Sequence, residues 1–218
     1  MNSLRAAYLW LNDPLNWQGT QGVPHLTGEH LLISGAAVAL AALVAMPLAM
    51  LLGHTGRGGG LTVVLTNVSR AIPTLALLTI FSATAIGFGD RATVIALAVF
   101  SIPPLLTNTY VGIRGVDSDV VEAARGMGLS GVAVLGRVEL PLALPLIAAG
   151  VRTAAVQAVA TATLAALVGG GGLGVVISVG FGQQDRGQII AGGVLVALLA
   201  LMTELVLSQV QRVVTPRR

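Results

Sequence analysis

The sequence predicts an all-α protein whose helices cross a lipid bilayer five times, and three observations carry this prediction. Of the 218 residues, 55% are hydrophobic and only 10% are charged, and the mean hydropathy is +0.87. A soluble domain needs about 25% charged residues to wet its surface. The apolar residues fall in five runs of about 20 or more, which is the length that crosses the hydrocarbon as a helix. These runs lack the alternation that is typical of barrel strands.

The five predicted spans follow one another along most of the chain. They occupy approximately residues His30–Leu52, Leu61–Ile86, Ala92–Ile113, Leu142–Val168 and Ile189–Val210. In hydrocarbon a segment must satisfy its own backbone hydrogen bonds, and a continuous apolar run does so as a helix. The spans and their connections are therefore expected to form one transmembrane domain over residues 29–213.

The two ends of the chain differ from the spans. In residues 1–28 polar residues interrupt the apolar ones, and Trp10 and Trp17 lie in a short amphipathic stretch. Tryptophan favours the boundary between hydrocarbon and headgroups, so we expect this segment to lie along the membrane surface, in contact with lipid. Residues 214–218 form a basic tail that contains Arg217 and Arg218.

The distribution of charge predicts an N-terminus outside the cell and a cytoplasmic C-terminus. All twelve basic residues are arginines, and the net charge is +3. With the C-terminus inside, seven arginines fall in cytoplasmic segments and three outside, which agrees with the positive-inside rule. The seven are Arg57, Arg114, Arg125, Arg137, Arg212, Arg217 and Arg218, and the three are Arg5, Arg91 and Arg186. Because the arginines are scattered rather than clustered, they do not indicate nucleic-acid binding.

The sequence offers few residues for bond-making chemistry. It contains no cysteine, which excludes disulfides and thiolate catalysis. His25, His30 and His54 are too dispersed for a metal site, so no metal is expected. The run Gly169–Gly174 lacks the Lys-Ser/Thr pair of a phosphate-binding loop, so no nucleotide site is expected on this chain.

Glycines and prolines mark candidate hinges. Gly169 and Gly172 stand at the end of the fourth span, where they predict a tight turn and a candidate outer gate. Pro73 in the second span, and Pro103 with Pro104 in the third, each remove a backbone hydrogen bond and predict a kink. Such kinks suit helices that hinge, although packing alone also explains them.

Two connections between spans are long. Residues 169–188 are rich in glycine and contain the apolar insert Leu173–Val179, which is too short to span and predicts a partly embedded or re-entrant turn. Residues 115–141 are the most charged part of the chain. There Asp117 or Ser118 can cap a short helix, a second short helix follows, and Pro141 fits the first turn of the next span. A compact charged helix–turn–helix between two spans indicates a docking surface.

Two sets of polar residues repeat at helical spacing within the spans. Thr153, Gln157 and Thr161 are spaced i, i+4, i+8 and share one face of the fourth span. They are candidates for lining a translocation path, and hydrogen bonding between helices is the alternative. Glu204, Ser208 and Arg212 have the same spacing in the last span. For them we expect an intrahelical pair or an interface contact.

The charged loop carries a pattern at fixed spacing, formed by Glu122, Ala123, Ala124, Gly128, Val138, Leu140 and Pro141. It resembles the EAA loop of ABC-importer permeases, which reads Glu-Ala-Ala, three residues, Gly, nine residues, Ile, one residue, Leu-Pro. The one departure is Val138 where the pattern has isoleucine. The resemblance implies a type I ABC-importer permease fold in which this loop couples the membrane helices to a separate ATPase.

Further segments resemble the osmoprotectant branch of these permeases. They are Ser69–Leu78, Asn108–Ile113, Glu139–Pro145, Gly150–Ala154 and Ala160–Gly174. That branch imports glycine betaine, choline, carnitine and proline betaine. The resemblance implies a multi-pass subunit of a bacterial cell membrane that works by alternating access and performs no bond chemistry itself.

The resemblance also implies partners. These are two cytoplasmic ATPase subunits that bind ATP and Mg²⁺, a second permease that is identical or paralogous, and an extracytoplasmic substrate-binding protein. No cofactor is expected on this chain. Two alternatives stay open: a permease for methionine or another amino acid, and a membrane enzyme that modifies lipids. The second would use Asp117, Asp119 and Glu122, which docking explains better.

Overall fold

The structure, a computed structural model, describes residues 3–60, 64 and 72–214, and every regular element within them is a helix. In chain order the helices are α1 (Ser3–Asn12), η1 (Pro14–Trp17), α2 (Val23–Thr55), α4 (Thr74–Ser82), α5 (Asp90–Arg114), α6 (Ser118–Gly126), α7 (Gly131–Val134), η2 (Leu135–Glu139), α8 (Leu140–Thr161), η3 (Ala162–Val168), α9 (Gly174–Gln183) and α10 (Arg186–Val214). The predicted all-α class is confirmed.

Four helical stretches of the described residues are long and apolar enough to cross a bilayer: Val23–Thr55, Asp90–Arg114, Gly131–Val168 and Arg186–Val214. They contain four of the five predicted spans. The remaining one, Leu61–Ile86, lies partly outside the described residues, as does the Ser69–Leu78 segment, and α4 is the helix described from that range. The count of five spans and the orientation therefore stay predictions.

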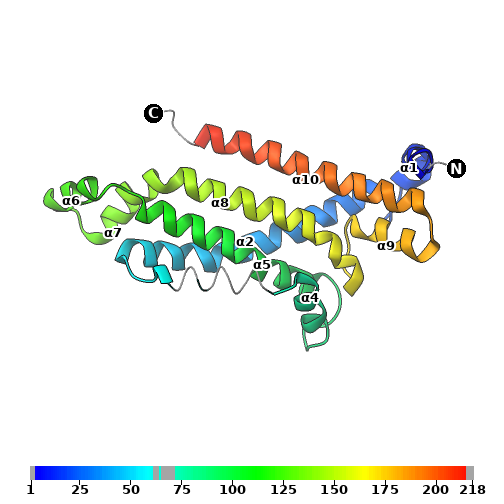
Figure 1. The fold of residues 1–218 in the computed structure, drawn as a ribbon, viewed down its shortest axis with the longest axis horizontal. Helices are drawn as coiled ribbons and strands as arrows, with labels where there is room; N and C mark the ends of the chain where they lie inside the picture. Colours follow the sequence, from blue (N-terminus) through cyan, green and yellow to red (C-terminus); the bar gives the residue numbers. More distant parts are fainter. Residues whose placement is uncertain (1–2, 61–63, 65–71, 215–218) are drawn as a thin grey trace.

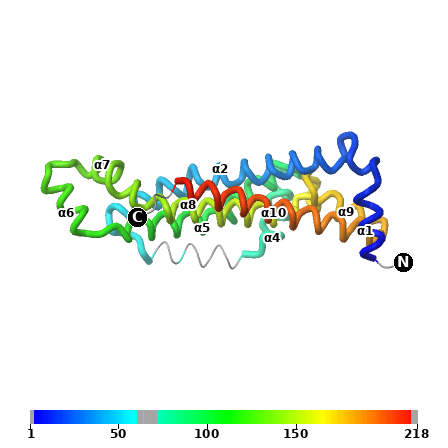
Figure 2. The backbone as a smooth tube through the Cα atoms, turned by 90° about the horizontal axis from the view of Figure 1, so that it is seen from above, coloured from blue at the N-terminus to red at the C-terminus, as the bar shows by residue number. Residues whose placement is uncertain are grey.

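The spanning helices are held together by small side chains. α2, α5, α8 and α10 run lengthwise beside one another (Figures 1 and 2). The central core combines Ala41, Ala45 and Ala49 of α2, Ala98, Leu105 and Leu106 of α5, and Ala154 of α8. In a membrane, where apolar side chains gain little by leaving lipid, helices associate by such close packing of small residues.

The helices place the predicted inner and outer segments at opposite ends of the bundle. α6, α7 and η2 lie at one end, which we call the loop end, and α1 and α9 lie at the other, the turn end (Figure 1). α10 begins at the turn end and runs toward the loop end (Figure 2). The C-terminal end of α10 thus points toward the end of the bundle where the charged loop lies. The positive-inside rule requires this if the loop end is cytoplasmic.

This arrangement gives a prediction about topology. A reporter fused after Arg218 is expected to be cytoplasmic, and one inserted near Gly89, at the turn between α4 and α5, is expected to be outside. Paired fusions to a fluorescent protein and to alkaline phosphatase, which are active on opposite sides of the membrane, measure this. Activity of the same reporter at both positions would contradict the five-span prediction.

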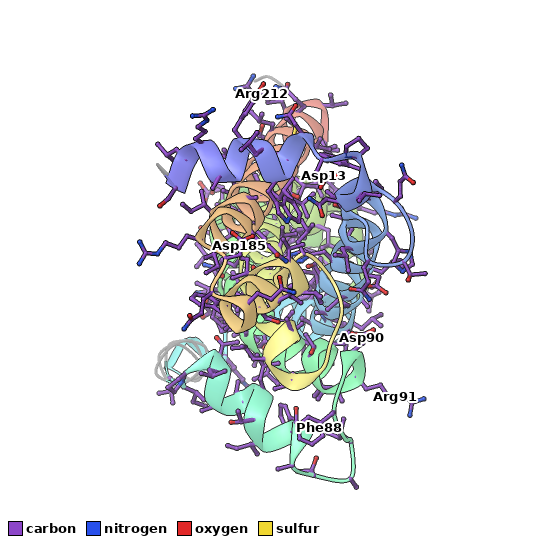
Figure 3. All side chains as sticks on the ribbon, turned by 90° about the vertical axis from the view of Figure 1, so that its right-hand side faces the viewer. Asp13, Phe88, Asp90, Arg91, Asp185 and Arg212 are labelled. Atoms are coloured by element: carbon purple, nitrogen blue, oxygen red, sulfur yellow. The ribbon has the colours of Figure 1, made fainter. Side chains whose placement is uncertain are left out.

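α1 lies across the turn end and packs on the start of α10 (Figure 3). The contact is close, because a Cβ atom added to Gly187 would lie 2.8 Å from the backbone of Ala6. Leu4, Tyr8 and Leu9 remain exposed on α1. An exposed apolar face of this kind is what an interfacial helix presents to lipid, so the predicted membrane-surface role stays open to test.

The apolar insert after the glycine run is a helix rather than the predicted turn. α9 spans Gly174–Gln183, and Gln184, whose φ is 56°, reverses the chain into α10. α9 then packs against α10 at Gly180 and Gly192, where added Cβ atoms would meet Ile189 and Ile177 at 2.9 and 2.6 Å. Gly180 and Gly192 therefore permit a close antiparallel contact between the two helices.

Candidate functional site

The charged loop folds as the predicted helix–turn–helix. Asp117 caps α6, since its side chain accepts a hydrogen bond from the Asp119 backbone N–H at 2.9 Å. Glu122 and Ala123 are exposed, whereas Ala124 is buried. Two residues of the pattern thus face outward from α6 and one packs inward.

Gly128 makes the turn between α6 and α7. Its φ is +85°, a left-handed conformation that residues with a Cβ rarely adopt. The turn closes with a hydrogen bond from Gly128 N to Arg125 O at 2.9 Å and one from Leu129 N to Ala124 O at 3.2 Å. Ser130 then caps α7 by accepting from the Ala133 backbone N–H at 3.3 Å. The glycine of the pattern is therefore required by backbone geometry.

The second half of the pattern joins the loop to the bundle. η2 is a π-helical turn that runs directly into α8 at Leu140. Leu140 packs beside Ile113 of α5 and Ile147 of α8, and Val138 is half-buried. Pro141 lies in the first turn of α8, as predicted.

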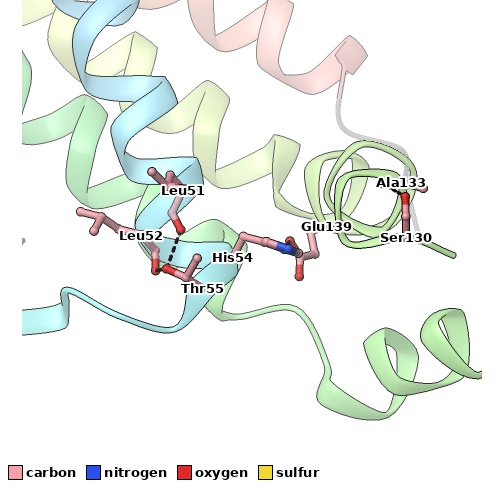
Figure 4. Close-up of polar contacts among 7 residues, drawn as sticks. All are labelled: Leu51, Leu52, His54, Thr55, Ser130, Ala133 and Glu139. Atoms are coloured by element: carbon pink, nitrogen blue, oxygen red, sulfur yellow. Dashed lines mark hydrogen bonds and ion pairs between the residues drawn. The ribbon is translucent and has the colours of Figure 1, made fainter.

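A partly buried hydrogen bond between side chains, which the sequence did not reveal, connects this loop to α2. The His54 Nδ1 atom lies 2.6 Å from Glu139 Oε2, and the two residues are 85 positions apart in the chain (Figure 4). Glu139 stands inside the pattern at its unspecified position, and His54 is the next-to-last residue of α2. The sequence shows Glu139 within the motif and His54 near the end of an apolar run, but no spacing rule predicts that the two meet.

The three candidate path residues share one face of α8, as their spacing predicts. Thr153 and Gln157 are exposed and Thr161 is half-buried, while Ala154 and Ala158, each one position further along the helix, are buried. In this chain the polar face thus points away from the helices that α8 packs against.

Glu204 makes a contact between helices, the second of the two expected kinds, rather than an intrahelical pair. Its Oε1 atom lies 3.5 Å from the Arg152 Nε atom, so the ion pair joins α10 to α8. Both side chains are partly exposed, which limits the strength of the pair. The carboxylate of Glu204 thus compensates the charge of Arg152, which precedes Thr153 in the chain.

The proline hinge candidates have two different settings. Pro73 immediately precedes α4 as its N-cap residue. Pro103 and Pro104 are both buried within α5, which continues through them from Asp90 to Arg114. The helix assignment is uninterrupted at the predicted kink, where Gly150 of α8 packs against the Pro104 carbonyl.

The glycine turn, which we define as Gly169–Leu173, is held by side chains of two other helices at the turn end. Gly169 and Gly172 have φ values of +73° and +88°, so the predicted tight turn is present. Asp90 of α5 accepts from the Gly171 N–H at 2.9 Å, and Glu29 of α2 accepts from the Gly172 N–H at 3.2 Å. Asp90 lies at this end in Figure 3.

His30 completes this set of contacts. It is fully buried, its Nδ1 accepts from the Leu173 N–H at 3.2 Å, and its Nε2 donates to the Val159 carbonyl at 2.7 Å. The three consecutive N–H groups of residues 171–173 are thereby satisfied by acceptors from α2 and α5. Among the described residues, no group of three or more His, Asp or Glu side chains is placed to hold a metal ion.

Comparison with known proteins identifies the family. Residues 37–218 match the model of the binding-protein-dependent transport system inner membrane component. The chain belongs to this family. It is a transport subunit of a bacterial membrane, and the alternative of a lipid-modifying enzyme is not supported.

Similar proteins extend over nearly the whole chain. The chain is 38% identical to the glycine betaine/carnitine/choline transport system permease protein OpuCB of Bacillus subtilis, covering 95% of this chain and 96% of that protein. It is 40% identical to the choline transport system permease protein OpuBB of the same organism, covering 87% of each.

Among solved structures, an inward-facing form of the MetNI methionine ABC transporter has a TM-score of 0.77 at 21% identity, covering 94% of this chain and 100% of that chain. This likeness supports the predicted type I permease fold, and at that identity it carries the fold alone.

Proposed function

We propose that this chain is the membrane-spanning permease subunit of an ATP-driven importer for quaternary-ammonium osmoprotectants such as glycine betaine, choline and carnitine. The observation that carries the proposal is the 38% identity to a glycine betaine/carnitine/choline permease over 95% of the chain. The likeness to the methionine transporter is lower, at 21% identity, so methionine is the less supported solute.

The proposed importer divides the work among several chains. Two cytoplasmic ATPase subunits bind ATP, a substrate-binding protein delivers the solute outside, and a second permease completes the path. The docking element, which we define as Ser118–Glu139, meets the ATPase through its exposed residues Glu122 and Ala123. Its movement switches the bundle between outward and inward access, and no bond chemistry occurs on this chain.

The polar face of α8 suits the proposed solutes. Thr153, Gln157 and Thr161 carry no charge, so they offer dipoles to a methylated ammonium group without holding it tightly. Arg152 next to this face would repel a cation, and its ion pair with Glu204 offsets that charge. At the turn end, Gly169 and Gly172 shape the proposed outer gate, and Pro73 and Pro103 remain hinge candidates.

Uptake by the reconstituted complex tests the proposal. Proteoliposomes that contain both permeases and the ATPase, supplied with binding protein and ATP, are expected to take up radiolabelled choline or glycine betaine and not methionine. Gln157→Leu is expected to lower uptake about fivefold, the value of one hydrogen bond of about 1 kcal/mol. The matched control is Gln183→Leu, an exposed glutamine at the end of α9. ATP-driven uptake of methionine alone would overturn the proposed substrate class.

A further inference from the structure

We propose that α2 transmits the movement of the docking element to the glycine turn, and that His54 and Glu139 are positioning residues that form its link at the loop end. This inference rests on the proposed function as an ATP-driven importer. It concerns one helix whose two ends contact the two parts of the molecule that must move together.

The first step concerns how the docking element is attached. The chain itself connects it to α5 through residues 115–117 and to α8 at the junction of Glu139 and Leu140. No such chain connection joins the element to α2. The hydrogen bond between the side chains of His54 and Glu139 connects them instead, with 2.6 Å between Nδ1 and Oε2. α2 is thus joined to the element by side chains.

The second step concerns the imidazole of His54, which lies next to both helical parts that follow the Gly128 turn. Its Nδ1 atom meets Glu139 in η2, and its Nε2 atom lies 3.4 Å from where a Cβ on Gly131, the first residue of α7, would stand. Figure 4 shows the His54 side chain pointing from the end of α2 toward Glu139. The imidazole therefore lies near both α7 and η2, and not near one of them alone.

The third step concerns the strength of the link. The side chains of Glu139 and His54 are only 6% and 19% exposed, so water and salt screen their interaction little. A short charge-assisted hydrogen bond has a defined length and direction, so it resists relative displacement of η2 and α2. Apolar side chains, by contrast, can slide past one another. Movement of η2 is therefore passed on to the end of α2.

The fourth step follows α2 to the turn end. The helix is continuous from Val23 to Thr55, which at 1.5 Å per residue is about 50 Å. Glu29 and His30, near its start, accept the hydrogen bonds of the Gly172 and Leu173 N–H groups, both at 3.2 Å. One helix thus carries the loop-end link at one end and two of the contacts that hold the glycine turn at the other.

The experiment uses the full complex and reports on the glycine turn. Because the natural chain has no cysteine, Phe88→Cys places a single thiol in this subunit. Phe88 is exposed beside the turn, where the neighbouring Gly89 N–H donates to Val168 O at 2.8 Å (Figure 3). The rate of labelling by a membrane-impermeant maleimide, with and without ATP and vanadate, reports whether the turn responds to the ATPase.

We expect Glu139→Gln and Glu139→Asp to reduce the ATP-dependent change in labelling, and the solute carried per ATP hydrolysed, by at least about fivefold. Glutamine removes the charge, and aspartate keeps it but shortens the reach. The reciprocal pair His54→Glu with Glu139→His is expected to restore both readouts in part. A residue needed only for folding would lower the amount of complex without lowering the response of each assembled complex.

Thr55→Ala is the matched control. Thr55 is the neighbour of His54, is exposed, and donates within its own helix to Leu51 O at 2.8 Å. A full labelling response in assembled Glu139→Gln or Glu139→Asp complexes would overturn the proposal. The readout needs no particular solute, so an ATP response at Phe88→Cys in a complex that transports no choline or betaine separates failure of the proposed function from failure of this inference.

Discussion

Replacing Glu122 by lysine is expected to abolish transport while the protein still inserts in the membrane. Glu122 is exposed in the middle of α6, and a substitution at such a surface position changes the free energy of unfolding little. In a docking surface, by contrast, reversing a charge places like charges together and costs several kcal/mol. Solute-stimulated ATP hydrolysis of the reconstituted complex is expected to fall more than tenfold, the effect of about 1.4 kcal/mol or more.

Gly128 gives an independent test of the same element. Its φ of +85° makes any side chain unfavourable, so Gly128→Asp and, more strongly, the β-branched Gly128→Val are expected to distort the turn and uncouple the ATPase. The matched control is Gly126→Ala, two residues earlier, where the backbone is helical and an added Cβ meets nothing within 4 Å. Normal stimulation in both Glu122→Lys and Gly128→Val would show that this loop is not the ATPase contact.

Local features of the docking element could be predicted because local residues determine them. A capping residue at Asp117, the run Glu122–Ala124 and the glycine at position 128 are each short-range signals with a definite backbone consequence. The shared face of Thr153 and Gln157 likewise follows from helical periodicity alone. What these residues do stays a proposal, since geometry within one chain does not reveal what meets them.

The contacts that sequence reasoning missed join residues far apart in the chain. His54 meets Glu139 across 85 positions, and His30 meets Leu173 across 143. Periodicity assigns a face to each residue of a helix but does not say which residue of another helix lies opposite. Histidines that looked dispersed, and were considered only as metal ligands, therefore have specific partners in the fold.

Glycine has two structural uses in this fold, and the sequence reveals only one of them. At Gly128, Gly169 and Gly172 it permits a left-handed backbone, as a local turn signal suggests. At Gly180 and Gly192 it lets α9 and α10 touch, which only the packed structure reveals. The insert Leu173–Val179 was expected to turn because it is too short to span, whereas the structure continues most of it as the helix α9, packed against α10.

Gly150→Leu is expected to have the largest effect on folding of any single change considered for α8. A Cβ at position 150 would lie 2.7 Å from Asn108 Cβ and 3.0 Å from Pro104 O, and the latter is backbone of α5 that cannot turn aside. One turn along the same contact, a Cβ on Gly112 would lie 3.2 Å from Ala143 O, so the two helices are close over a continuous length.

The leucine at position 150 must therefore push α5 and α8 apart, because no rotamer removes its Cβ. Overpacking of this kind costs about 1–3 kcal/mol or more, against about 1 kcal/mol gained from the better helix propensity of leucine. We expect the Tm of the purified protein in detergent, followed by size-exclusion chromatography after heating, to fall by about 2–4 °C for each kcal/mol of net destabilisation. Gly193→Leu, the same change on an exposed face of α10 with nothing within 4 Å of the added Cβ, is expected to leave the Tm unchanged or raise it. Equal Tm values for the two variants would mean that α5 and α8 are not packed backbone to backbone at Gly150.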